Sequence, residues 1–262
     1  MKHVPRKRFG QHFLTDQTVI ADIVAAIRPQ ADDPMVEIGP GLGALTSPLC
    51  AVLRHLHVIE IDRDIAARLQ GAYSSAHVTV HTGDVLEFDF SALPANLRVV
   101  GNLPYNISTP LLFHLARYAE RIHDMHFMLQ KEVVERMVAP PGGGEYGRLS
   151  VMLQYRFDME LLLEVPPEAF SPPPKVESAV VRMLPRPAAQ LNAASEVGMA
   201  QVVRSAFSQR RKTLRNSLAG LMGVEDYLGL GIAPGLRAEN LAVSDFVAIS
   251  NYLSEKGKLT AK

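Results

Sequence analysis

The sequence lacks most of what marks a secreted, membrane-spanning or metal-clustered protein. Its 262 residues include one cysteine, Cys50, and no tryptophan. A single cysteine excludes an internal disulfide and a cysteine-based metal cluster, and it suits a reducing compartment. No apolar run approaches the roughly 20 residues of a membrane span, and none of signal-peptide length follows the basic N-terminus. We therefore expect a cytoplasmic protein with no membrane partner.

Net charge is also absent, because 27 basic residues balance 27 acidic ones. The balance hides an uneven distribution. Acidic residues outnumber basic ones up to residue 184, whereas basic residues outnumber acidic ones after it. Arg6, Lys7 and Arg8 precede the first acidic residue, Asp16. Positive charge at both ends of the chain predicts a polyanionic partner that is bound through the termini.

Short apolar runs alternate with helical patterns, which predicts an α/β fold with a mostly parallel sheet. The last two strands leave no room for a helix between them and should form an antiparallel hairpin at the sheet edge. The Pro-rich segment 184–187 indicates a linker, so we expect one domain over 1–188 and a small all-helical one over 189–262. The expected strands are 35–39, 57–61, 78–81, 99–102, 125–130, 161–165 and 178–183, and the expected helices include 16–27, 62–71, 110–118 and 132–138.

The first of these strands runs into a glycine loop of the form Glu37-x-Gly39-x-Gly41-x-Gly43. Glycines let backbone N–H groups approach a ligand closely, so the loop indicates a nucleotide-type cofactor. Gly39, Gly41 and the following Ala44 also satisfy the dinucleotide pattern, and Glu60 stands where a ribose-binding acid is expected. The loop and the acid therefore leave NAD and S-adenosyl-L-methionine both open, with Glu37 and Gly43 favouring the methyl donor.

Polar residues end the next strands too. Glu60 can accept hydrogen bonds from both ribose hydroxyls, and we expect Val58, Ile59 and Ile61 to bury its segment. Asp84 can accept from an adenine amine, although a plain turn aspartate is the alternative, and Asp62 is expected to cap the next helix. Because ligands of open α/β sheets bind at the carboxyl ends of the strands, these residues and Asn102 should meet at one rim.

The segment Asn102-Leu103-Pro104-Tyr105 follows the fourth strand and suits the methylation of an exocyclic amine. The Asn102 side-chain oxygen and the Leu103 carbonyl can both accept from an NH2 group and so direct its lone pair toward a methyl donor. Pro104 stiffens the turn, and Tyr105 offers a face on which a flipped base can stack. The alternative is an ordinary strand-end turn, because Asn and Pro are common there.

With these motifs in order, the chain resembles the ribosomal RNA adenine N6-dimethyltransferases, and most closely their bacterial small-subunit branch. The segments 6–14 (RKRFGQHFL) and 170–178 (FSPPPKVES) are similar to two further motifs of that family. One departure is His12, where many members have Asn. The resemblance implies a Rossmann-like class I methyltransferase domain, an N-terminal segment that folds over S-adenosyl-L-methionine, and cofactor contacts from His12, Leu14, Gly39, Gly41, Glu60, Asp84, Val85 and Asn102.

The resemblance also implies the substrate: two adjacent adenosines in a hairpin loop near the 3′ end of small-subunit rRNA, each methylated twice. We expect Tyr105 and Phe170 to sandwich the adenine, although a core phenylalanine is the alternative for Phe170. We expect no metal, because His123 and His126 fit surface or packing roles better than ligation. The partner is expected to be an immature small ribosomal subunit, bound by a monomer.

No acidic residue occurs from 197 to 224, whereas five basic residues do. If the segment is one helix, Arg204, Arg211 and Arg215 share a face beside an apolar docking stripe of Val203, Phe207, Leu214, Leu218 and Leu221. The alternative is a basic helix face that only contacts solvent. The similarity of 210–216 to the C-terminal domain of the family favours RNA binding by Arg204, Arg210, Arg211, Lys212 and Arg215, together with Arg6, Lys7 and Arg8.

Four other functions compete with this interpretation. A large-subunit rRNA adenine methylase of the macrolide-resistance type shares the front motifs, but the basic run 210–218 argues against it. A DNA adenine-N6 methylase is more distant, because Asp-Pro-Pro-Tyr-like forms dominate there. A non-catalytic ribosome assembly factor could use the same fold, and an NAD oxidoreductase survives only if the glycine loop is considered alone.

Overall fold

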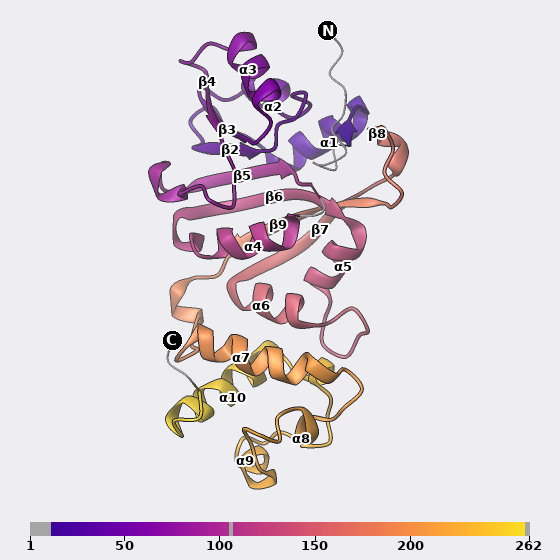
Figure 1. The fold of residues 1–262 in the computed structure, drawn as a ribbon. Coiled ribbons are helices and arrows are strands. Elements are labelled where there is room, and N and C mark those ends of the chain that lie inside the picture. The colour runs from indigo at the N-terminus through magenta and orange to yellow at the C-terminus, as the bar shows by residue number, and fades with distance from the viewer. Residues whose placement is uncertain (1–11, 105–106, 260–262) are drawn as a thin grey trace. The chain divides into compact units, whose positions relative to one another are not determined.

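The computed structural model describes residues 12–104 and 107–259 (Figure 1). The chain forms two compact units. The first holds the described residues up to 134 together with 158–185, and the second holds 135–157 and 186–262. Residues 135–157 belong with the C-terminal helices, which no sequence pattern had indicated; their Tyr146, Val151 and Tyr155 side chains pack in the core of the second unit.

Seven described strands of the first unit form one sheet in the order β4-β3-β2-β5-β6-β9-β7. The pairs β2–β3, β3–β4, β2–β5 and β5–β6 are parallel, whereas β9 runs antiparallel to β6. The expected mostly parallel sheet is confirmed, and the last two strands are neighbours at its edge. The strands are β2 (Met35–Ile38), β3 (Leu56–Glu60), β4 (Val78–Thr82), β5 (Leu97–Asn102), β6 (Ile122–Gln130), β7 (Phe157–Val165) and β9 (Ser178–Pro185).

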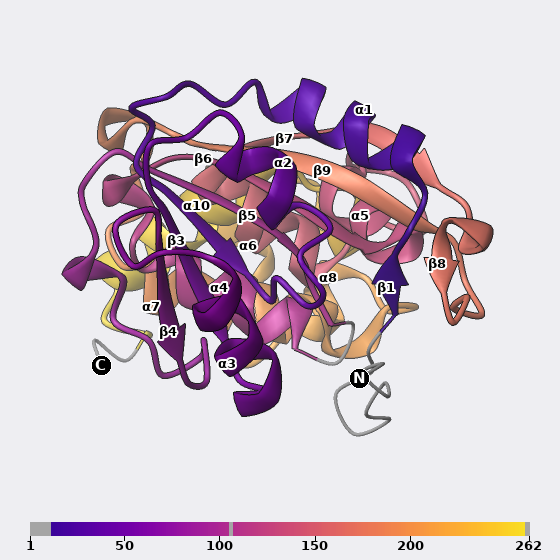
Figure 2. The same cartoon turned by 90° about the horizontal axis from the view of Figure 1, so that it is seen from above.

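Helices cover both faces of this sheet, which is why most residues of its central strands are buried. Side chains of α1, α2 and α3 pack with the sheet in one large cluster. Figures 1 and 2 show α1 and α4 on opposite faces of the central strands. The helices of the first unit are α1 (Gln17–Ile27), α2 (Thr46–Cys50), α3 (Arg63–Ala72) and α4 (Ser108–Ala116), and α5 (Lys131–Val138) runs across the boundary at residue 134.

The strand boundaries differ from expectation by one to four residues, and two of the differences are informative. The strand β3 ends at Glu60, and Ile61 is 48% exposed rather than buried, so the expectation that it buries this segment was wrong. The strand β7 begins at Phe157, four residues before the expected start at Leu161. The missed residues lie on a sheet-edge strand whose charged side chains, such as Asp158 and Glu160, break the apolar pattern. By contrast, Asp62 caps α3 as expected, accepting from the Asp64 backbone N–H at 3.0 Å.

A second, two-stranded sheet joins distant parts of the first unit. β1 (Phe13–Leu14) pairs antiparallel with β8 (Phe170–Ser171), so that Phe13 faces Ser171 and Leu14 faces Phe170. Figure 2 shows the two short strands side by side. This pairing ties the beginning of the described chain to the loop that follows β7.

The second unit is helical in its described residues, as the sequence predicted. Its core contains Tyr146, Tyr227 and Phe246, all fully buried. The single helix expected through 204–215 is wrong, because α7 ends at Ala206 and a 3-10 turn follows at Phe207–Gln209. The helices are α6 (Arg148–Arg156), α7 (Glu196–Ala206), α8 (Leu214–Ser217), α9 (Val224–Gly229) and α10 (Val243–Glu255). No helix in the described part of the chain has the length and apolar character needed to cross a membrane.

Candidate active site

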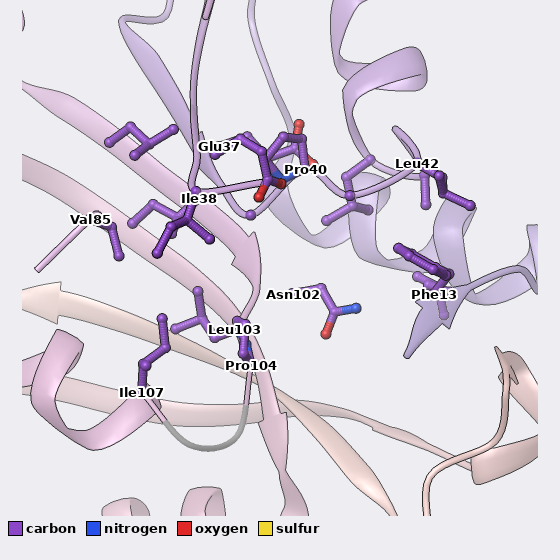
Figure 3. A pocket seen from close by; sticks show the side chains of 18 of the residues that line it. Phe13, Glu37, Ile38, Pro40, Leu42, Val85, Asn102, Leu103, Pro104 and Ile107 are labelled. Carbon is purple, nitrogen blue, oxygen red and sulfur yellow. The ribbon is translucent and has the colours of Figure 1, made fainter. Parts of the chain in front are cut away.

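A cavity of about 340 Å³ lies at the carboxyl ends of β2, β3 and β5 and beside the turn that follows β4, entirely within the first unit (Figure 3). That volume is in the range of small-molecule sites. The eight residues predicted to contact the cofactor all line it, although their roles remain predictions. The lining comprises His12–Leu14, Glu37–Leu42, Ala44, Leu45, Ile59–Ile61, Gly83–Val85, Asn102–Pro104 and Ile107.

The glycine loop forms one wall of the cavity in a conformation that depends on glycine. Gly39, Gly41 and Gly43 have φ values of 65°, 53° and 91°, a region that side chains other than glycine disfavour. A Cβ on Gly41 would lie 3.3 Å from the Phe13 ring. The Gly39 N–H donates to the Ile59 carbonyl at 2.9 Å, which fixes the loop against β3. The loop can therefore bring backbone close to a ligand, as the motif predicts.

Glu60 and Asp84 stand at successive strand ends. Glu60 is 5% exposed and accepts from the Asp62 backbone N–H at 2.8 Å. Burial raises the pKa of Glu60, and hydrogen bonds from backbone N–H groups oppose that rise. Asp84 accepts from the Leu86 N–H at 2.9 Å, which is the turn role weighed as the alternative, and it also lines the cavity. The two carboxylates can thus serve hydroxyl and amine donors of a nucleoside.

Asn102 ends β5 and faces the N-terminal segment. Its side-chain nitrogen donates to the His12 carbonyl at 3.3 Å. Figure 3 shows the amide nitrogen on the side of Phe13, with the oxygen turned away from it. The Leu103 N–H donates to the Met128 carbonyl at 3.1 Å and anchors the turn to β6. Tyr105, the predicted stacking residue after Pro104, lies outside the described residues, as do Arg6, Lys7 and Arg8.

Phe170 is not among the residues that line the cavity. It is 4% exposed, pairs with Leu14 across the small sheet, and packs in the large core cluster. This placement matches the core alternative, because the β1–β8 pairing turns the ring inward. Its stacking role remains a prediction. The same loop instead holds His12, whose Nδ1 lies 2.8 Å from the Pro172 carbonyl.

Several lining residues escaped the sequence analysis. Phe13 and Ile107 flank predicted motifs, and Leu45 follows the glycine loop. Ile61 was expected in the core but is an exposed apolar residue at the cavity wall. The available signal was that Ile61 directly follows Glu60, the acid expected at the strand end. Burial of Ile61 would have required β3 to continue for one more residue.

The strand β2, which leads into the glycine loop, contains a buried acid whose partners the sequence did not reveal. Glu37 is 2% exposed and accepts from the Thr46 hydroxyl at 2.6 Å. Burial raises the pKa of Glu37 to about 7, with the Glu60 charge as a smaller contribution in the same direction. Glu37 also lines the cavity. This carboxyl is therefore poised to change its charge near neutral pH.

The predicted RNA-binding residues of the second unit are all exposed, namely Arg204, Arg210, Arg211, Lys212 and Arg215. They lie on α7, on the following turn and on α8, so no single helix face carries them. Arg210 donates to the Gly144 carbonyl, which ties the glycine-rich loop 142–144 to this basic segment. Val203, Leu214 and Leu218 are buried as expected. In the described part of the chain, no group of three or more His, Cys, Asp or Glu residues could hold a metal ion.

The sequence model for ribosomal RNA adenine dimethylases matches residues 2–255 of the chain. The chain belongs to this family. The small-subunit ribosomal RNA methyltransferase A of Dechloromonas aromatica is 61% identical, over 96% of this chain and 99% of that protein. A dimethyladenosine transferase from Plasmodium falciparum has a similar structure, with a TM-score of 0.81, 25% identity and coverage of 94% and 98%.

The structure of the 23S rRNA methyltransferase ErmE is also similar, with a TM-score of 0.72, 26% identity and coverage of 92% and 99%. The family fold is thus shared with a large-subunit enzyme, as the motifs in the first part of the sequence suggested. The 61% identity to a small-subunit methyltransferase far exceeds the 26% identity to this enzyme. Membership of the family makes the chain a methyltransferase and excludes the NAD oxidoreductase interpretation.

Proposed function

We propose that the chain transfers methyl groups from S-adenosyl-L-methionine to N6 of two adjacent adenosines in a hairpin loop near the 3′ end of small-subunit rRNA, giving N6,N6-dimethyladenosine during small-subunit biogenesis. The observation that carries the proposal is Asn102. It stands at the end of β5 with its nitrogen engaged by the His12 carbonyl. Its oxygen is thereby oriented as a hydrogen-bond acceptor inside a nucleoside-sized cavity.

The cavity residues fit the cofactor. Glu60 is a buried carboxylate that can accept from ribose hydroxyls, and Asp84 can accept from the adenine amine. Ile61 offers an exposed apolar surface for a ring, and the glycine loop lets backbone approach the amino-acid portion. When bound, the cofactor supplies an electrophilic methyl group on a sulfonium, which is a good leaving group.

The task left to the protein is positioning and desolvation. The Asn102 oxygen and the Leu103 carbonyl accept from the N6 amine and aim its lone pair at the methyl group. Leu103, which is 1% exposed, and Ile107 line the cavity beside the amine and exclude water there. The reaction needs no metal in this scheme. The exposed basic residues of the second unit, from Arg204 to Arg215, contact the phosphates of the RNA.

The large-subunit methylase is the second candidate, because the structure of such an enzyme shares the fold. The two can be separated with purified protein, labelled S-adenosyl-L-methionine, and undermethylated small subunits beside large subunits and duplex DNA. Nucleosides are then identified by mass spectrometry. We expect N6,N6-dimethyladenosine in small-subunit rRNA alone.

Two variants make the experiment specific. Asn102→Ala should abolish transfer while S-adenosylhomocysteine still binds. Asn192→Ala removes the same side chain at an exposed position of the second unit and should leave transfer unchanged. Label in large-subunit rRNA would move the assignment to the second candidate. Cofactor binding without transfer to any substrate would favour an assembly factor.

A further inference from the structure

Glu37 is a buried acid that the proposed chemistry does not use. It is 2% exposed and accepts a hydrogen bond from the Thr46 hydroxyl at 2.6 Å. Figure 3 shows its carboxyl turned into the cavity above Asn102. The Thr46 backbone also donates to the carboxyl. A buried carboxylate is costly unless it is well paired, and hydrogen bonds from one uncharged residue are a weak counterpart to a full negative charge. Some further group should therefore compensate Glu37 when it is ionised.

The strand order indicates which group that is. If Asp84 binds the base and Glu60 the ribose, the cofactor runs from the end of β4 to the end of β3. The target amine is held at Asn102, on β5. β2 lies between β3 and β5, and Glu37 is its acid. The methyl-bearing sulfur, which joins the ribose to the reacting amine, must accordingly lie over β2.

The groups that face Glu37 from the elements packed against it do not provide a positive charge. They are Glu60 on β3, Cys50 on α2 and Tyr73 after α3. Burial raises the pKa of the Cys50 thiol to about 11, so it is neutral near pH 7. Among the described residues, the acid thus shares its surroundings with a second carboxylate and two neutral groups. A cation in the cavity would favour its ionised form.

We infer that Glu37 responds to the charge of the bound nucleoside: its carboxyl is ionised when the cationic methyl donor is bound and takes up a proton when the uncharged sulfide product replaces it. The sulfonium gives S-adenosyl-L-methionine one more positive charge than S-adenosylhomocysteine. Glu37 is on this view a positioning residue that favours the donor over the product. The inference rests on the proposed function, because it requires this cofactor in this cavity.

The proton balance is explicit. Methyl transfer breaks the sulfur–carbon bond and forms a nitrogen–carbon bond, and the methylated N6 then loses one proton. Glu37 takes up one proton as the positive charge disappears, so the bound complex releases little acid to solvent. The proton is released later, when S-adenosyl-L-methionine displaces S-adenosylhomocysteine and Glu37 ionises again. Product exchange, rather than transfer, is then the step that acidifies the solution.

Isothermal titration calorimetry in buffers of different ionisation enthalpy tests this directly, because it counts protons released on binding. At pH 6.5, where free Glu37 is mostly protonated, S-adenosyl-L-methionine should release most of one proton and S-adenosylhomocysteine essentially none. At pH 8.5 neither should. The affinity for the donor should rise about fourfold between these values, because with a pKa of about 7 roughly three-quarters of the free Glu37 carboxyl groups are protonated at pH 6.5 and almost none at pH 8.5.

Two variants separate Glu37 from its neighbours. Glu37→Gln keeps an acceptor for the Thr46 hydroxyl but cannot ionise, so proton release and the pH dependence of donor affinity should both disappear. Thr46→Val keeps the shape of the side chain and removes the hydroxyl donor. Because that hydrogen bond favours the charged carboxylate, its loss should move the proton-release profile to higher pH. A purely structural role for Thr46 would not shift the profile.

The outcomes are distinct. Donor binding by the unaltered protein without linked proton release would overturn the inference and leave the proposed function standing. Proton release that persists in Glu37→Gln would assign it to Glu60 and also overturn it. A Thr46→Val profile at the original pH would contradict it even if Glu37→Gln failed to fold. Absence of any donor binding would overturn the proposed function itself, and the inference with it.

Discussion

Gly101 provides the sharpest test of how the site is built. It is the register partner of Ile38 across β2 and β5, one residue before Asn102 and one strand away from Gly39. A Cβ at this position would lie 2.5 Å from the Ile38 carbonyl oxygen and 3.1 Å from a Leu103 methyl. To reach the 3.4 Å at which ordinary contact begins, the two backbones must separate by about 0.9 Å.

We expect Gly101→Ala to lower the free energy of unfolding by about 3 kcal/mol, the upper end of overpacking costs, because the obstructing atom is backbone and cannot rotate away. The same separation displaces Asn102 from the glycine loop. A misplacement of about 1 Å can cost roughly a hundredfold in rate, so activity of the remaining folded protein should fall by about that factor. Urea titration and single-turnover methyl transfer measure the two effects.

The control is Gly71→Ala in α3, where an added Cβ meets nothing within 4 Å. Alanine is favoured over glycine in a helix, so this variant should be more stable by about 0.5–1 kcal/mol and fully active. If Gly101→Ala unfolded within 0.5 kcal/mol of the unaltered protein and kept its transfer rate, the close approach of β2 and β5 would not be a requirement of the site.

Three further predictions concern charge. Arg98→Met removes two hydrogen bonds, of 2.8 and 2.7 Å, from the buried Asp124 carboxylate and leaves that charge without its ion-pair partner, so it should lower the free energy of unfolding in urea by about 3–5 kcal/mol. A second change in the same protein, Asp124→Leu, should restore part of that free energy, and no restoration would contradict the ion-pair argument. Arg211→Gln should reduce the salt slope of RNA binding by about 1, whereas Arg54→Gln, an exposed arginine of the first unit, should leave the slope unchanged, and equal effects would argue against a local RNA surface. Burial lowers the pKa of His126 to about 4 from its ordinary 6.5, so the unfolded chain binds more protons than the folded chain between these pH values. The free energy of unfolding should therefore be unaffected by His126 above pH 6.5 and should fall as the pH is lowered toward 4. His126→Gln should reduce that fall by up to about 3 kcal/mol, and identical pH profiles of the two proteins would refute the argument.

The sequence alone brought Gly39, Glu60 and Asn102 to one cavity because each of them ends or directly follows a strand, and their cofactor contacts remain predictions. Parallel strands bring their carboxyl ends to one edge, so the positions of Gly39, Glu60 and Asn102 followed from strand assignment alone. The predicted contacts from Gly39 to Asn102 line one cavity for this reason, whereas His12 and Leu14 lie at the β1–β8 pairing. No comparable rule places the β1–β8 pairing, which joins residues more than 150 positions apart through strands of two residues each. Such short strands carry no periodic signal.

The departures from expectation have the same origin. Phe170 is buried opposite the distant Leu14, a partner that the sequence pattern did not indicate, and its stacking role remains a prediction. The segment through 204–215 shows helical periodicity, but the helix breaks at Phe207. There Leu214 and Leu218 reach the core from a new helix instead of continuing the old one. Burial of Val203, Leu214 and Leu218 was predicted correctly because it depends on their apolar character, whereas the path of the backbone depends on packing partners.

The hydrogen bond between Asn102 and His12 has a consequence for the order of binding. The segment that carries His12 is held by the β1–β8 pairing and by the Pro172 carbonyl, and the resemblance predicts that it covers the cofactor. The same contact orients the Asn102 oxygen toward the target amine. If the segment settles only when the cofactor is present, the amine acceptor is assembled only in the loaded protein. RNA that arrives first would then find Asn102 without its orienting partner, which favours an ordered sequence in which the methyl donor binds before the adenosine.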